Sequence, residues 1–347
     1  MQKVSKPGGE YNIYDFNKVW RFLPLNRPRK ELLKGFLFAV FPFLFRKWAI
    51  CQNWKNSRVF RDNGKNVFCP DFWRHRFFLP YKLHIPKNTA SKEQSESGIS
   101  LAVVIHVFYP DIFREILLLL KSSGNKKMML FITTPHALYN EVKEILTYET
   151  FRYHIEPVEN RGRDILPFLK ILPRIFDEGY QLVLKIHTKN SEHLLRSNSW
   201  RQDLIMKLIG DDQLSKNIQV FQQNRNIGIV GPAGHILPMS LYYGANASTV
   251  KWLCNKMELQ DNQLHGFHFV AGSMFFALKE ALQPLLKISL TDKEFEPEEN
   301  QLDGTMAHAM ERAFSASMIK AGLILADTSC SSENGSYVVN VNHSFTI

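Results

Sequence analysis

The alternation of apolar strands and helices between residues 101 and 187 limits the possible folds more than any other feature of this sequence. Strand-like segments at 101–106, 128–133, 153–158 and 182–186, the first of them a continuous apolar run, alternate with helix-like segments at 110–121, 137–148 and 165–176. Buried strands joined by helical crossovers are typical of a parallel sheet that is covered on both faces. We therefore predict an α/β domain with a mainly parallel central sheet.

Cationic side chains follow two of these strands directly. Arg161 and Arg163 come after the third strand, and His187 and Lys189 come after the fourth. Ligands of open α/β sheets bind beyond the carboxyl ends of the strands. Guanidinium and ammonium groups at that edge suit an anion such as a diphosphate.

The first of these clusters, Asn-Arg-Gly-Arg-Asp-Ile at 160–165, allows a second interpretation. Gly162 lets the backbone turn tightly or approach a ligand closely. The alternative is that the two arginines only pair with Glu159 and Asp164 at the surface, as solvated charge runs commonly do. The second cluster, one crossover later, favours a binding site.

The remaining half of the chain is less regular. We expect helices at 200–209 and 213–222, a strand at 227–230, a strand, turn and strand over 267–278, and a helix over 303–321 with Asp303 as its N-cap and Gly322 at its end. No Walker loop, no Gly-x-Gly-x-x-Gly after a strand and no Gly-x-Ser-x-Gly elbow occurs, which disfavours an ATPase, a dinucleotide enzyme and a serine hydrolase.

Four short motifs carry a resemblance to a known family. They are the Arg-Gly-Arg motif (160–165), the His-Thr-Lys motif Lys-Ile-His-Thr-Lys-x-Ser (185–191), the Ala-Gly-Ser motif Phe-Val-Ala-Gly-Ser-Met-Phe (269–275) and the Leu-Asp-Gly motif Leu-Asp-Gly-Thr-x-x-His-x-x-Glu-Arg (302–312). In this order they resemble the rhamnan synthesis F family of bacterial glycosyltransferases over roughly residues 100–330. The resemblance implies transfer of a sugar, typically rhamnose, onto a growing surface polysaccharide.

The outline of strands and helices also resembles the GT-A fold of nucleotide-sugar transferases. Common members of that fold end the strand equivalent to 182–186 in Asp-x-Asp, which holds a divalent cation on the donor diphosphate. This chain has His187, Thr188 and Lys189 there, so two carboxylates of a hard-oxygen cage are missing. The four cysteines also form no metal-binding spacing, and we expect reduced thiols and no metal cofactor.

Roles follow for the residues of the four motifs. We expect the donor to be bound by Asn160, Arg161, Gly162, Arg163, Asp164, His187 and Lys189, and the sugar or acceptor by Gly272, Ser273, His308 and Arg312. For the base that takes the proton of the acceptor hydroxyl we propose Asp303, with Glu311 in reserve. The alternatives are that Asp303 only caps its helix and that His187 is a structural residue.

The N-terminal segment, residues 1–90, differs from the rest in charge. It holds 18 Lys and Arg and 5 Asp and Glu, a balance of +13, and 19 of the 43 aromatic residues. This mixture suits the headgroup region of an anionic membrane, with nucleic acid as the competing partner. The apolar run 35–45 favours lipid, but it is shorter than the roughly 20 residues that span a bilayer. No cleavable signal is apparent. A core helix interrupted at Pro42 is the alternative for this run.

These observations define three segments, a linker between the first two, and two alternative functions. We expect a membrane-associating segment (1–90), a linker at 89–98, a GT-A-like domain (99–330) and a C-terminal tail (331–347). The first function is a cytoplasmic glycosyltransferase, peripheral on the inner face of the membrane, that uses a nucleotide-sugar, dTDP-rhamnose being favoured, and a lipid-linked glycan acceptor, without nucleic acid. The second is a non-catalytic glycan- or nucleotide-binding subunit on the same fold.

Overall fold

The computed structural model describes residues 23–25, 27–45, 48–57, 99–125, 127–188, 197–264, 267–299, 301, 303–330, 332–333 and 336–337. Lys189, the expected linker at 89–98 and most of the expected C-terminal tail lie outside these residues.

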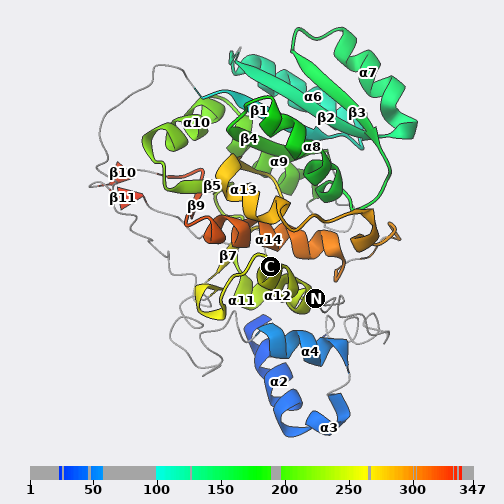
Figure 1. Cartoon of the computed structure of the whole chain (residues 1–347), viewed down its shortest axis with the longest axis vertical. Coiled ribbons are helices and arrows are strands. Elements are labelled where there is room, and N and C mark those ends of the chain that lie inside the picture. The colour runs from blue at the N-terminus through cyan, green and yellow to red at the C-terminus, as the bar shows by residue number, and fades with distance from the viewer. Residues whose placement is uncertain are drawn as a thin grey trace.

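A seven-stranded sheet forms the centre of the protein, with the strand order β3-β2-β1-β4-β8-β5-β9 (Figure 1). Its strands are β1 (Leu101–His106), β2 (Met128–Pro135), β3 (Tyr153–Val158), β4 (Leu182–His187), β5 (Ile227–Gly231), β8 (Phe275–Leu278) and β9 (Ile324–Asp327). Every neighbouring pair is parallel except the two that involve β8, which runs antiparallel to β4 and β5. The predicted α/β class with a mainly parallel sheet is therefore confirmed.

Helices cover both faces of the sheet because side chains alternate along each strand. In β1, Leu101, Val103 and Ile105 face one core, whereas Ala102 and Val104 face the other. The first core is closed by α6 (Pro110–Ser122), α7 (Tyr139–Thr147), α9 (Ser197–Ile209) and α10 (Gln213–Gln223), with η3 (His136–Leu138) leading into α7. The second is closed by α8 (Ile165–Asp177), α12 (Ala247–Lys256), α13 (Lys279–Leu286) and α14 (Met306–Lys320).

The stretch 267–278 forms the expected strand, turn and strand, but its two strands belong to different sheets. β7 (His268–Val270) pairs with β6 (Ile236–Pro238), whereas β8 enters the central sheet. The smaller elements are α11 (Met239–Tyr242), η4 (Asp261–Leu264), η5 (Asp292–Glu294), β10 (Ser332–Glu333) and β11 (Ser336–Tyr337). The turn between β7 and β8 lies at the edge of the sheet where β4 ends.

The expectation that Asp303 caps the last long helix is wrong. Helix α14 begins at Met306, and its N-cap is Thr305, whose Oγ1 accepts a bond from the backbone N–H of His308 at 3.4 Å. Thr305 also bonds to the Nδ1 atom of His308 at 2.7 Å, so a Thr and His pair closes the first turn. Asp303 lies before this cap, and its carboxylate accepts hydrogen bonds from Ala245 and Asn246 instead.

Three helices of the N-terminal segment are described: α2 (Arg27–Val40), α3 (Pro42–Phe45) and α4 (Ala49–Asn56). Helix α2 begins eight residues before the apolar run 35–45, and Pro28 is tolerated in its first turn. Phe38 is buried and packs edge-on against Phe45 and Trp54. These helices lie at the end of the molecule opposite β3 and α7, next to α11 and α12 (Figure 1).

No helix within the described residues is long and apolar enough to cross a membrane.

Candidate active site

Lys185 occupies the centre of the candidate site, although it lies in an otherwise apolar strand. Its side chain is almost fully buried and forms an ion pair with Asp164, the residue before α8. The Nζ atom also donates to the carbonyl oxygen of Ser273 at 2.8 Å and to its Oγ at 2.9 Å. One ammonium group thus joins the Arg-Gly-Arg, His-Thr-Lys and Ala-Gly-Ser motifs.

The charges of this pair depend on each other. Burial lowers the pKa of Lys185, and the carboxylate of Asp164 opposes that effect. Burial would raise the pKa of Asp164, but the positive charges of Lys185 and His187 hold it well below its usual range. In a buried ion pair, each group stays charged only while its partner and its hydrogen bonds are present.

His187 closes β4 and is buried rather than open to solvent. Its Nε2 donates to the carbonyl oxygen of Gly272 at 2.9 Å and lies 4.0 Å from the Asp164 carboxylate. His106 is its neighbour in register on β1 and contacts Thr133 Oγ1 at 3.0 Å. Burial lowers the pKa of His106 to about 4, although Asp164 opposes that shift, so this ring is neutral at pH 7.

Thr188 connects the end of β4 to the loop after β1. Its Oγ1 accepts hydrogen bonds from the backbone N–H groups of Phe108 and Tyr109, at 2.8 and 2.9 Å. Thr188 is fully buried. The His-Thr-Lys motif therefore fixes the loop after β1 at the carboxyl ends of β1 and β4, where the strand order changes direction.

The turn at Gly272 and Ser273 is held from several sides. The N–H of Gly272 donates to Glu311 Oε1 at 2.6 Å, and its carbonyl accepts the bond from His187. Gly272 has φ +89°, and a Cβ there would lie 2.8 Å from the Trp200 ring. Packing against Trp200 therefore explains this glycine. Ser273 has φ +55°, a left-handed conformation that costs a non-glycine residue on the order of 1 kcal/mol or more.

Arg163 brings the Arg-Gly-Arg motif against the Leu-Asp-Gly motif. Its Nη1 donates to His308 Nε2 at 2.8 Å, its Nε is 3.3 Å from Glu298 Oε2, and its Nη2 donates to the Gln301 carbonyl. Because a guanidinium can only donate, Nε2 of His308 is the acceptor of this bond, and its Nδ1 faces the backbone N–H and the Oγ1 of Thr305. Arg163 is another left-handed non-glycine residue, with φ +56°.

Arg161 and Gly162 form the other side of this loop. The backbone of Arg161 bridges to Pro297, and its side chain forms no ion pair within the described part of the chain. Gly162 has φ +66°, and a Cβ there would lie 2.6 Å from the Leu166 side chain and 2.7 Å from that of Phe295. A larger residue would push the loop away from residues 295–297. In the described residues, neither arginine pairs with Glu159 or Asp164.

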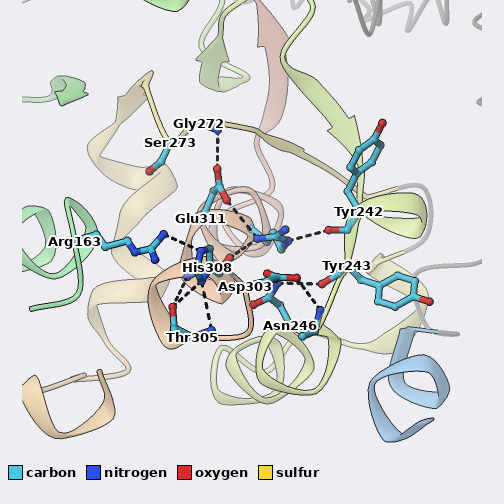
Figure 2. Close-up of polar contacts among 12 residues, drawn as sticks. Arg163, Tyr242, Tyr243, Asn246, Gly272, Ser273, Asp303, Thr305, His308 and Glu311 are labelled. Atoms are coloured by element: carbon cyan, nitrogen blue, oxygen red, sulfur yellow. Dashed lines mark hydrogen bonds and ion pairs between the residues drawn. The ribbon is translucent and has the colours of Figure 1, made fainter. Parts of the chain in front are cut away.

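Asp303 accepts hydrogen bonds on both carboxylate oxygens (Figure 2). The donors are the N–H of Ala245 at 3.0 Å and the side-chain amide of Asn246 at 2.5 Å. Burial would raise the pKa of Asp303, but the charge of Arg312 and these hydrogen bonds lower it. The carboxylate is therefore ionised at neutral pH and fixed in orientation.

Arg312 and Glu311 connect this carboxylate to the Gly272 turn. Arg312 donates to the carbonyls of Tyr242 at 3.1 Å and His308 at 2.5 Å, and its guanidinium lies 4.9 Å from the ring centre of Phe269. It also contacts Glu311 Oε2 at 3.3 Å. In Figure 2, Glu311 points toward Gly272, whereas Asp303 lies on the side of Asn246 and Tyr243.

Most residues expected at the site are thus joined by contacts at one edge of the sheet. These are Arg163, Asp164, His187, Gly272, Ser273, His308, Glu311 and Arg312, and the charge of Arg312 also acts on Asp303. Lys189 lies outside the described residues, and Asn160 is exposed beside the loop. The roles expected for all of them remain predictions.

Several buried polar residues of this region are absent from the sequence-based expectations. Lys185 could have been identified from the sequence, because a lone Lys within a buried strand requires a partner. No sequence pattern pointed to Asn246 or Thr305. Asp203 and His235 also form a contact of 2.7 Å near Trp200, and burial lowers the pKa of His235 although Asp203 opposes that shift.

The described residues contain no group of three or more His, Cys, Asp or Glu side chains placed to hold a metal ion. The expectation of metal independence stays a prediction.

The fold and the site together define an α/β protein whose polar residues converge from four separate motifs on the carboxyl edge of a mainly parallel sheet. The chain belongs to the rhamnan synthesis protein F family, whose model matches residues 62–321. The match begins earlier than the four motifs alone indicate. The family description connects the chain with the synthesis of rhamnan, a polysaccharide.

Two similar proteins come from two strains of Xanthomonas campestris pv. campestris, B100 and ATCC 33913, and each is called "Uncharacterized protein WxcX". Each is 36% identical to this chain over 223 residues, which cover 64% of this chain and 32% of the relative. The matching region thus spans about a third of the length of these relatives.

Proposed function

We propose that this protein is a glycosyltransferase that moves a sugar, rhamnose or a related hexose, from a nucleotide-diphosphate donor onto a growing bacterial surface polysaccharide. The observation that carries the proposal is the network of contacts that joins the four motifs around Lys185. This residue bonds to Asp164 and Ser273, and the chain of contacts continues through Gly272 to Glu311 and Arg312.

The sheet supports a GT-A-like assignment for the domain. One antiparallel strand, β8, is inserted between two parallel sets, and the strand order reverses between β1 and β4. Ligands of such sheets bind at the reversal point, beyond the carboxyl ends. Here, the buried side chains of His106 and His187 lie at the ends of β1 and β4, next to the reversal point.

The loop that carries Arg161 and Arg163 is suited to bind the donor diphosphate. Arg161 contributes a guanidinium that forms no ion pair within the described residues. Contacts with Glu298 and His308 fix the orientation of the Arg163 guanidinium. Lys189, outside the described residues, follows in the motif after Thr188. Such cations stabilise the negative charge that develops on a departing nucleoside diphosphate.

Asp303 fits the role of catalytic base for the acceptor. The acceptor hydroxyl loses its proton to the carboxylate, its oxygen bonds to the anomeric carbon, and the bond from that carbon to the diphosphate breaks. Asn246 and Ala245 fix the carboxylate in one orientation. Proton transfer to a positioned carboxylate contributes roughly 10²–10⁴-fold.

A non-catalytic binding subunit is the second candidate, and one observation favours it. The hydrogen bonds on both oxygens of Asp303 and the charge of Arg312 lower the pKa of Asp303, which makes it a weaker base. A subunit that only binds glycan or nucleotide would use the same residues for recognition.

Incubation of the purified full-length protein with dTDP-, UDP- and GDP-sugars separates these functions. We expect release of the nucleoside diphosphate from one donor, faster in the presence of a lipid-linked glycan, with dTDP-rhamnose favoured. Binding of a donor without any release, in the presence of acceptor, would instead identify a binding subunit.

A further inference from the structure

The turn between α2 and α3 presents large apolar side chains to solvent. Phe36, Phe43 and Leu44 are 61%, 69% and 56% exposed, and Val40, Phe41 and Trp48 are exposed as well. All six lie within one short stretch of the chain, between residues 36 and 48. Single exposed apolar residues are ordinary, but a contiguous group marks an interaction surface.

This surface belongs to an ordered unit that is fixed to the rest of the protein. Phe38 packs between Phe45 and Trp54 and gives the three helices a small core of their own. The side chains of Asn53 and Asn56 bond to Ser248 at the start of α12, each at 2.8 Å. The exposed residues are therefore left over after the unit has formed its own core and its contact with the domain.

The sequence of this segment is strongly basic. Residues 23–57 contain seven Lys and Arg and a single acidic residue, Glu31. Large apolar side chains next to cations are the chemistry of a helix that lies in the headgroup region of an anionic bilayer. A nucleic acid would use the cations but not the exposed Phe and Leu side chains.

We propose that the apolar surface of α2 and α3 (Phe36, Val40, Phe41, Phe43, Leu44 and Trp48) docks on an anionic lipid surface, with these side chains among the headgroups and the neighbouring cations on the lipid phosphates. Helix α2 has 14 residues and ends before Pro42, so the unit lies in the interface and does not cross it.

This docking also brings the candidate base close to the membrane, a part of the inference that rests on the proposed function. Lys34 of α2 lies over the Tyr243 ring, with its Nζ 5.9 Å from the ring centre. The Tyr243 carbonyl accepts a bond from Asn246 at 3.1 Å, and the same amide donates to Asp303. Three residues, Lys34, Tyr243 and Asn246, thus connect the docking unit to the carboxylate that would receive a proton from a lipid-linked acceptor.

Vesicle flotation tests the docking without any enzyme assay. We expect the full-length wild-type protein to float with vesicles of phosphatidylcholine and phosphatidylglycerol and to bind pure phosphatidylcholine vesicles more weakly. The triple variant Phe36→Ser, Phe43→Ser, Leu44→Ser should partition at least about tenfold less to the anionic vesicles, because each serine removes a large apolar side chain.

The matched control replaces an exposed leucine on the opposite part of the molecule. Leu118 of α6 is 65% exposed, and Leu118→Ser should leave flotation unchanged. Equal flotation of the triple variant and the wild type would overturn the proposal, because cations alone would then hold the protein. Failure of the wild type to float would also overturn it, as would a stable dimer in solution that the triple variant dissociates.

A transfer assay tests separately whether docking places the candidate base near the membrane. The triple variant should transfer sugar to a water-soluble acceptor at the wild-type rate but lose transfer to an acceptor embedded in anionic vesicles. Equal transfer to both acceptors by the two proteins would contradict the orientation. If neither protein transfers sugar to any acceptor, the proposed function fails while the flotation result stands.

Discussion

Lys185 and Asp164 form a buried ion pair that joins the central strand β4 to the start of α8. The Lys185→Met variant leaves the Asp164 carboxylate buried without its partner and removes two bonds to Ser273. Breaking a buried pair on one side typically costs about 3–5 kcal/mol. We expect a loss of this size in the free energy of unfolding, measured by denaturant titration.

The double variant Lys185→Met, Asp164→Asn is the control for this prediction. It removes both charges, so it should recover a large part of the lost stability. If Lys185→Met alone is as stable as the wild type, the pair does not hold the site together.

Arg163 allows its side chain to be tested separately from its backbone. Its φ of +56° suits glycine, so Arg163→Gly keeps the loop conformation without strain while it removes the whole side chain, including the guanidinium. We expect this variant to be at least as stable as Arg163→Ala and to lower donor turnover by on the order of 10²-fold. Thermal unfolding and release of nucleoside diphosphate measure the two effects. Wild-type turnover in Arg163→Gly would show that the arginine is structural.

The stability of the protein should fall with pH below neutrality because of His106. Its pKa is about 4 in the folded protein, below the ordinary value of 6.5, so the unfolded chain binds more protons between these two values. The contribution of His106 to the free energy of unfolding is therefore fully present above pH 6.5 and is lost as the pH falls toward 4. The loss at pH 4.5 should be about 2–3 kcal/mol.

Denaturant unfolding at pH 7 and 4.5 measures this loss, and His106→Asn should reduce it. A wild-type protein with the same stability at both pH values would contradict the assignment of a buried neutral ring to His106.

Activity should survive a chelator. In the proposed GT-A-like assignment, the position of the metal-binding Asp-x-Asp carries His187 and Thr188, whose side chains face Gly272 and the loop after β1. The diphosphate charge is then balanced by arginines. Transfer assayed in EDTA should match transfer in buffer alone, whereas abolition by EDTA with rescue by manganese would reveal a carboxylate site outside this account.

The first four strands of the sheet were predictable from the sequence because strand-like segments alternate there with helix-like segments, whereas β9 was not predicted. The limits of β1 and β3, and the position of β4, agree with the predictions to within a residue. The N-terminal limit of α14 could not be predicted in the same way. Asp303 and Thr305 are both good N-cap residues, and the choice depends on Asn246, which is 57 residues away in sequence.

The members of the site were predictable as motifs, but their contacts were not. Arg163 pairs with Glu298, 135 residues later, and not with the acidic neighbours that sequence proximity favours. His187 turns toward the Gly272 carbonyl because β4 and β8 pair antiparallel, which brings the two motifs together. Such long-range contacts come from the topology of the sheet and leave no local pattern.

The most direct test of the central claim compares the wild type with Asp303→Asn in transfer of sugar from a nucleotide donor to a lipid-linked glycan. Asn retains a side-chain oxygen for one of the two hydrogen bonds but cannot accept the proton. The account predicts that the wild type extends the acceptor and releases one nucleoside diphosphate per sugar, and that a folded Asp303→Asn is slower by roughly 10²–10⁴-fold. Transfer by Asp303→Asn at the wild-type rate would contradict the assignment of the base, and absence of transfer by the wild type with every donor would contradict the proposed function.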